Sequence, residues 1–194
     1  MGIRVALALG LAYGLGCLAS GYWLVRWWTG RDLRQLGSGS TGATNAGRVL
    51  GRAGFILTML LDMGKGAGAI GCGLVLGLPP TWLAYALLAV VLGHVFPAQL
   101  DFRGGKGLAA GLGALAAYDW RLSALVLVFA GGLALLTSQT TLSLMAVLLT
   151  VPFQALILER TLAEAIGLAL AVIVIIVAHK TNIAKAWQAR PGQE

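Results

Sequence analysis

Three separated segments carry most of the side chains that could do chemistry. Residues 37–48 read GSGSTGATNAGR, residues 93–107 read GHVFPAQLDFRGGKG, and the tail from residue 178 reads AHKTNIAKAWQARPGQE. Each segment combines small or hydroxyl-bearing residues, amides or an imidazole with at least one cation, which is the set of groups that binds anions. Their chemistry is therefore expected to involve a negatively charged reactant.

The first segment has the composition of a phosphate cradle. Its glycines, Gly39 among them, allow positive φ and a close approach to a ligand, while Ser38, Thr44 and Asn45 supply short hydrogen-bonding groups. Arg48 adds a forked cation suited to a tetrahedral oxyanion. The GxxxxGK[ST] spacing of a P-loop is missing, so nucleotide hydrolysis is not indicated. A glycine-rich, solvated loop is the competing interpretation.

The second segment places a lysine between glycines at the start of a predicted helix. Lys106 follows Gly104 and Gly105, so a point charge would lie beside the N–H groups of a helix N-terminus, again an anion site. His94 lies at the apolar end of the preceding helix, where packing is the favoured role for a lone histidine.

The tail offers a candidate base. His179 and Asn182 are three residues apart and share one face if the last helix continues. They could act as a general base and an orienting or oxyanion-stabilising group. The alternative is an amphipathic basic tail that lies on anionic lipid.

An acid and a base follow the first segment inside an apolar stretch, LLDMGKG at residues 60–66. Asp62 and Lys65 lie three apart on one helix face. Each charge at the centre of a bilayer costs about 2.5 to 3.5 kcal/mol, so both must face the protein interior or a wet cavity. An intramembrane ion pair that holds helices together is at least as good an interpretation as direct chemistry.

The composition shows what kind of elements must position these groups. The chain has 194 residues, of which 58% are hydrophobic and 11% charged, whereas soluble domains are about 25% charged. We therefore predict a single all-α domain over residues 1–194, a multi-pass integral membrane protein. Long apolar runs place seven transmembrane helices at 3–25, 53–77, 81–98, 105–118, 121–137, 141–158 and 162–178.

Basic residues predict the orientation. Seven spans put ten Lys and Arg residues of loops 26–52 and 99–106 and of the tail on one side and only Arg4, Arg121 and Arg160 on the other, and the excess marks the cytoplasm. The N-terminus is then outside and the C-terminus cytoplasmic. By parity, all three polar segments face the cytoplasm, and one shared site becomes possible.

The same reading excludes several classes of protein. The net charge of +7 reports topology, so no nucleic acid partner is expected. Cys17 and Cys72 lie in apolar stretches without metal-ligand spacing, so neither a disulfide framework nor a metal site is predicted. A cleavable signal peptide at the N-terminus is disfavoured, because the apolar run continues into GYWLVRWW, which resembles the interfacial end of a span.

Together, GSGSTGATNAGR, LLDMGKG, GHVFPAQLDFRGGKGLA and HKTNIAK resemble, in order and spacing, the hallmarks of the bacterial acyl-phosphate-dependent glycerol-3-phosphate acyltransferases, the PlsY family. The resemblance covers nearly the whole chain. It implies transfer of a fatty acyl group from acyl phosphate to the 1-hydroxyl of glycerol 3-phosphate, giving lysophosphatidic acid and inorganic phosphate in phospholipid biosynthesis. It further implies a multi-pass enzyme of the bacterial cytoplasmic (inner) membrane, without cofactors, that depends functionally on the enzyme producing acyl phosphate.

The family's functional residues can be carried over to matching positions. The resemblance implies catalytic roles for Ser38, His179 and Asn182, and places the loop arginine at Arg48 and the GGKG lysine at Lys106. A family serine near the start of the sixth span has only a loose counterpart in Thr141. The expected substrate-binding set also includes five small or polar neighbours, which are Gly39, Thr44, Asn45, Gly104 and Gly105. Asp62 and Lys65 are expected to form a structural polar network.

The sequence departs from the family pattern at several positions. Ser40 replaces an asparagine, Ala110 a threonine and Lys185 an arginine, while the closing Gly and Glu correspond only to Gly192 and Glu194. Ser40 and Lys185 keep polarity but lose amide or forked geometry. A change in activity or substrate preference relative to typical members is therefore open.

In the expected mechanism the protein mainly has to position its two anionic substrates. Either His179 or a phosphate oxygen of the substrate takes the proton of the attacking hydroxyl, and the absence of a carboxylate partner for His179 favours the substrate. The rival class is a small-anion transporter or channel, which intramembrane charges and glycine-interrupted helices also suit. A purely structural membrane subunit is a third, weaker alternative.

Overall fold

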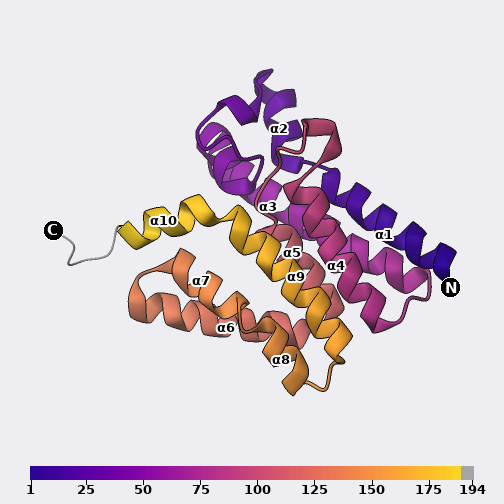
Figure 1. Cartoon of the computed structure of the whole chain (residues 1–194). Helices are drawn as coiled ribbons and strands as arrows, with labels where there is room; N and C mark the ends of the chain where they lie inside the picture. The colour runs from indigo at the N-terminus through magenta and orange to yellow at the C-terminus, as the bar shows by residue number, and fades with distance from the viewer. Residues whose placement is uncertain (189–194) are drawn as a thin grey trace.

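The computed structural model describes residues 1–188 and contains helices and loops without strands over that range. Arg190, Gly192 and Glu194 lie outside the described residues. Figure 1 shows the helices packed side by side, with the N-terminus at one edge of the molecule and α10 directed away from it. The all-α prediction is confirmed.

The first half of the chain supplies three long apolar segments. α1 (Gly2–Cys17) continues after a two-residue break into α2 (Ser20–Thr29), and a short 3-10 turn η1 (Leu33–Gln35) leads into the loop before α3 (Ala43–Val75). α4 (Pro80–Val95) is followed by a second 3-10 turn, η2 (Ala98–Leu100). Each of the stretches Gly2–Thr29, Ala43–Val75 and Pro80–Leu100 is long and apolar enough to cross a membrane.

The second half is more interrupted. α5 (Leu108–Tyr118) and α6 (Trp120–Thr137) are separated by Asp119 alone, α7 (Thr140–Leu148) and α8 (Val151–Ile157) meet at 44°, and α9 (Leu162–Ala178) and α10 (Lys180–Gln188) meet at 60°. Up to residue 188, α6 is the one helix of this half that is long and apolar enough to span a membrane by itself.

Within residues 1–188 the structure thus has four helices that can cross a membrane, or up to six if each bent pair forms one span. The predicted span at 105–118 is shorter than expected, because α5 has 11 residues and extends about 16 Å at 1.5 Å per residue. Gly107, at φ 79°, delays the start of this helix to Leu108. The count of seven spans and the orientation of the termini stay predictions.

Glycines allow α5 to pack tightly on α3. A Cβ at Gly66 would overlap the carbonyl of Ala110, and one at Gly113 would overlap the carbonyl of Met63. Such close backbone approach at small residues is typical of helices packed in membranes. The contact fixes the start of α5, which carries Lys106 in the loop before it, against α3.

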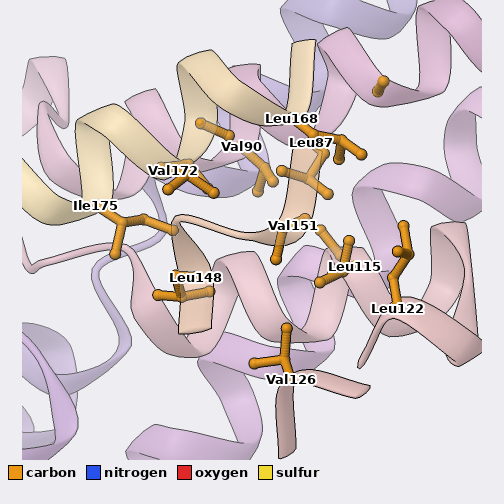
Figure 2. Close-up of a cluster of buried hydrophobic side chains, with 14 of the residues drawn as sticks. Leu87, Val90, Leu115, Leu122, Val126, Leu148, Val151, Leu168, Val172 and Ile175 are labelled. Carbon is orange, nitrogen blue, oxygen red and sulfur yellow. The ribbon is translucent and has the colours of Figure 1, made fainter. Parts of the chain in front are cut away.

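The main core lies where α4 to α9 meet. Figure 2 shows Leu87 and Val90 of α4 facing Leu168 and Val172 of α9, with Leu115 of α5 beside them. Large apolar side chains also remain outside, as in Val75, Leu135, Leu136 and Ile157, which are 80% exposed or more. Such a surface suits lipid, whose tails are as apolar as these side chains.

Candidate active site

The loop at residues 37–48 is folded around one buried amide. Asn45 is 1% exposed; its Oδ1 accepts the N–H of Ser38 at 3.0 Å, and its Nδ2 donates to the carbonyls of Leu33, Leu36 and Ser40 at 3.2, 2.9 and 2.9 Å. Because both N–H groups of the amide are engaged, Asn45 shapes the cradle and has no amide donor left for a phosphate. The expectation of direct phosphate binding by Asn45 is therefore replaced by a positioning role.

A kink in α3 sets the direction of its first two turns. Gly51 has φ 70° and ψ −163° inside α3, a conformation that is essentially restricted to glycine. The short helical stretch before it, residues 43–50, therefore takes a direction different from that of residues 52–75. It carries Thr44 and Arg48 to the cavity described below.

The GGKG loop is held by backbone hydrogen bonds to the end of α4. The N–H of Gly104 donates to the carbonyl of Val95 at 3.1 Å, and that of Gly105 to the carbonyl of His94 at 3.0 Å. These N–H groups are occupied, so they are not the free anion-binding donors expected from the sequence. A Cβ at Gly105 would overlap the imidazole of His94, so this glycine lets the loop lie directly on the ring.

The tail completes the site at the junction of α9 and α10. His179 terminates α9, and its Nδ1 lies 2.8 Å from the carbonyl of Ile175; a proton on Nδ1 leaves Nε2 as the acceptor. One turn later Asn182 accepts a hydrogen bond through Oδ1 from Lys106 Nζ at 2.6 Å. The pair joins two segments that are 76 residues apart in the sequence.

One cavity of about 240 Å³ brings the three polar segments together. Polar and charged side chains and apolar side chains of α3 and α5 line it together. The predicted site residues on its wall are Ser38, Thr44, Asn45, Arg48, Asp62, Lys106, His179 and Asn182.

The electrostatic environment of the cavity favours an anion. Lys106 is partly desolvated and lies near Arg48 and Lys185, and these three effects lower the pKa of its ammonium group. Like charges that repel one another are stabilised together by a bound dianion. The arrangement can therefore hold a phosphate beside the imidazole of His179.

The predicted intramembrane ion pair is present. Lys65 Nζ lies 3.0 Å from Asp62 Oδ1, and both side chains are almost fully buried. The same ammonium donates to the carbonyls of Gly16 and Leu18 at 3.1 and 2.6 Å. Lys65 therefore caps the end of α1, and Asp62 neutralises it, so the pair fastens α3 to the break between α1 and α2.

Four expected substrate contacts do not reach the cavity wall. Gly39, at φ 72°, turns the loop and donates its N–H to Leu36, and Gly104 and Gly105 pack behind Lys106. Thr141 lies in the first turn of α7 outside the lining.

Sequence reasoning missed several wall residues. Phe55, Met59 and Met63 share the cavity face of α3 with Asp62, and His94 forms part of the wall. Phe55, Met59, Asp62 and Met63 follow the spacing i, i+4, i+7 and i+8, which places them on one helical face. This spacing could have identified them from the sequence. The buried His94 was expected to pack, and it does, but beneath the GGKG loop and beside Asp62.

The fold and the cavity define a multi-pass helical membrane protein with a polar, cationic site enclosed by its helices. Residues 6–189 match the family described as "Glycerol-3-phosphate acyltransferase", and the chain belongs to this family. The PlsY resemblance drawn from the four motifs is thereby confirmed.

Individual relatives agree with the assignment. "Glycerol-3-phosphate acyltransferase 1" of Desulfitobacterium hafniense is 47% identical over 173 residues, which are 89% of this chain and 85% of the relative. A "Glycerol-3-phosphate acyltransferase" of Enterococcus faecalis is 38% identical over 76% of this chain and 69% of its own length. The crystal structure of PlsY (YgiH), "an integral membrane glycerol 3-phosphate acyltransferase", in its glycerol 3-phosphate form superposes with a TM-score of 0.86 at 26% identity, covering 96% of this chain and 93% of that one.

Proposed function

We propose that this chain transfers a fatty acyl group from acyl phosphate to the 1-hydroxyl of glycerol 3-phosphate, releasing lysophosphatidic acid and inorganic phosphate. Family membership supports an enzyme over the small-anion transporter and the structural subunit. The observation that carries the proposal is the convergence of Ser38, Arg48, Lys106, His179 and Asn182 on one cavity. A transport pathway would instead need polar groups along the whole depth of the membrane.

Glycerol 3-phosphate binds through its phosphate to Arg48 and Lys106, the two cations on the cavity wall. Ser38 and Thr44 add hydroxyl groups beside them. Asn182 holds the Lys106 ammonium at 2.6 Å and so fixes where the phosphate is received. Gly104 and Gly105 support this geometry from behind by packing on the end of α4.

Acyl transfer then requires the 1-hydroxyl to meet the acyl carbonyl at about 3 to 3.5 Å. The oxygen forms a bond to the carbonyl carbon, the bond to the donor phosphate breaks, and inorganic phosphate leaves. The hydroxyl proton goes to a phosphate oxygen, with His179 Nε2 as the alternative acceptor. His179 has its Nδ1 on a backbone carbonyl, so no carboxylate raises its basicity, which supports the substrate-assisted route.

The acyl chain of the donor lies among apolar side chains that continue from the cavity. Leu108 and Leu112 line both the cavity and a narrow apolar groove between α5 and α9. The groove has a volume of only about 20 Å³, so α9 or α7 has to move outward for a chain to occupy it.

The proposed location is the bacterial cytoplasmic membrane, with the cavity facing the cytoplasm. There the enzyme that makes acyl phosphate can supply the donor. No residue cluster in the sequence calls for a metal, and no group of three His, Cys, Asp or Glu side chains suited to an ion occurs in residues 1–188.

Purified protein in detergent, given palmitoyl phosphate and radiolabelled glycerol 3-phosphate with excess EDTA, tests the activity. Labelled lysophosphatidic acid is the expected product, and its absence with folded protein would contradict the proposal. Palmitoyl-CoA in place of palmitoyl phosphate should give no product. His179→Ala separates the two proton routes: residual turnover is expected for substrate assistance, and complete loss with intact glycerol 3-phosphate binding would favour His179 as the base.

A further inference from the structure

Asp62 and His94 lie on the cavity wall, yet the acyl transfer described above uses neither of them. Their side chains are 1% and 5% exposed. They come from different helices, α3 and α4, and both adjoin the GGKG loop region through the imidazole on which Gly105 packs. A buried polar pair at this place is a candidate for a second contact to the substrate.

The pair has unused hydrogen-bonding capacity. Asp62 Oδ1 and His94 Nδ1 are 3.7 Å apart, too far for a good hydrogen bond, and His94 Nδ1 has no hydrogen-bond partner among residues 1–188. Asp62 Oδ1 is contacted by the Lys65 ammonium at 3.0 Å, and a carboxylate oxygen can accept a second hydrogen bond. A buried donor without a partner costs about 1 to 3 kcal/mol, so a ligand that accepts from His94 Nδ1 while donating to Asp62 is favoured.

The chemical group that fits is a hydroxyl. An alcohol can donate its proton to the Asp62 carboxylate and accept one from the Nδ1–H tautomer of His94 at the same time, which an ammonium or a second carboxylate cannot do. Both atoms are covered in this conformation, so a small rotation of the carboxylate or the imidazole has to accompany binding. The imidazole of His94 lies beside Asp62 and packs against Gly105 of the loop that carries Lys106.

We propose that Asp62 and His94 form a hydroxyl-binding floor that recognises the second, non-reacting hydroxyl of glycerol 3-phosphate and thereby selects it over deoxy alcohols. The inference rests on the proposed function, since it assigns a further contact in the same substrate. Lys106, Arg48, Asp62 and His94 line the same cavity, so the proposal has the phosphate held by the two cations and the middle hydroxyl by the floor. The floor thus fixes the orientation that presents the terminal hydroxyl to the acyl carbonyl.

The test compares two acceptors, glycerol 3-phosphate and 3-hydroxypropyl phosphate, which keeps the phosphate and the terminal hydroxyl but lacks the middle one. Wild-type kcat/KM should favour glycerol 3-phosphate at least tenfold, because a site built to bind a hydroxyl discriminates against the analogue without it. His94→Phe should lower kcat/KM for glycerol 3-phosphate about tenfold or more, while leaving the deoxy acceptor nearly unchanged. His94→Gln, which keeps a donor, should retain part of the preference.

Tyr85→Phe removes a polar group elsewhere on α4 and is the matched control, with both acceptors unaffected. Equal use of the two acceptors by the wild type would overturn the proposal by itself, as would a proportional loss with both in His94→Phe. Should His94→Phe fail to fold, the same ratio is read from His94→Gln and Asp62→Asn. Lack of product from either acceptor in the wild type would instead refute the proposed acyl transfer and is thus a distinguishable result.

Discussion

At the scale of single residues, the site depends on side chains that hold other side chains. Asn45 uses all its amide hydrogen bonds to fold the cradle loop, and Asn182 holds Lys106. Residue type and spacing identified these asparagines, but a sequence does not tell whether an amide meets the substrate or the backbone. That distinction depends on which carbonyls the folded loop turns inward.

Lys106 leads to a prediction about pH. Desolvation, with repulsion from Arg48 and Lys185, lowers its pKa, so its cation is lost at a lower pH than the value of about 10.4 for an ordinary lysine. If the cation binds phosphate, kcat/KM for glycerol 3-phosphate falls as pH rises through this lowered pKa. Lys106→Arg stays charged at such pH and should move the alkaline limb upward while lowering the maximal rate about tenfold. Identical alkaline limbs in initial-rate profiles of the two proteins would contradict the assignment.

At the scale of elements, long apolar runs were predictable and their interruptions were not. The spans near 3–25, 53–77 and 81–98 coincide with α1 and α2, with α3 and with α4, because about 20 apolar residues suffice to mark a span. The run 141–158 is equally apolar but bends by 44° between α7 and α8. Apolar composition does not record such a bend, and α3 begins ten residues before the predicted span because polar residues 43–52 also form helix.

The kink at Gly51 is the element on which the position of Arg48 depends. Gly51→Ala introduces a side chain at φ 70° and ψ −163° and should cost about 1 to 3 kcal/mol. We expect a lower melting temperature in detergent and a higher KM for glycerol 3-phosphate, since the turns that carry Arg48 lose their direction.

Gly68→Ala is the control for the kink, because Gly68 is helical in the same element and has no atom within 4 Å of its Cβ position. It should leave KM unchanged and slightly raise stability. An unchanged KM in Gly51→Ala would show that the kink does not position the arginine.

At the scale of the whole molecule, the sequence predicted that three distant polar segments share one site. The cavity confirms that convergence for Ser38, Lys106 and His179. Lys106 lies just before the start of α5. His179 lies at the end of α9, which runs antiparallel to α5. What the sequence did not reveal is the clamp at the other ends of these helices, where Asp119 follows α5 and Arg160 precedes α9.

This clamp should govern stability separately from catalysis. The Asp119 side chain is 2% exposed and accepts hydrogen bonds from Arg121 at 2.9 Å and Arg160 at 2.6 Å, which hold its pKa well below the usual range. Because the arginines are partly exposed, losing hydrogen bonds to this charged group costs about 1.5 to 3 kcal/mol. Asp119→Asn should therefore lower the melting temperature in detergent markedly, while KM and kcat at a temperature where both proteins are folded stay near wild type.

The pH dependence of that stability has a defined sign. A carboxylate whose folded pKa is depressed stabilises the fold above its unfolded pKa of about 3.9, and this contribution is lost as pH falls towards the folded value. The difference in melting temperature between wild type and Asp119→Asn should thus persist from neutral pH to about pH 4 and become smaller below it. Asp101→Asn is the control, because that carboxylate is 87% exposed in its pair with Arg34 and contributes about 1 kcal/mol or less. If Asp119→Asn melts like Asp101→Asn, the ends of α5 and α9 are held by other contacts, such as the hydrogen bond from the Tyr118 hydroxyl to Glu164 at 2.6 Å.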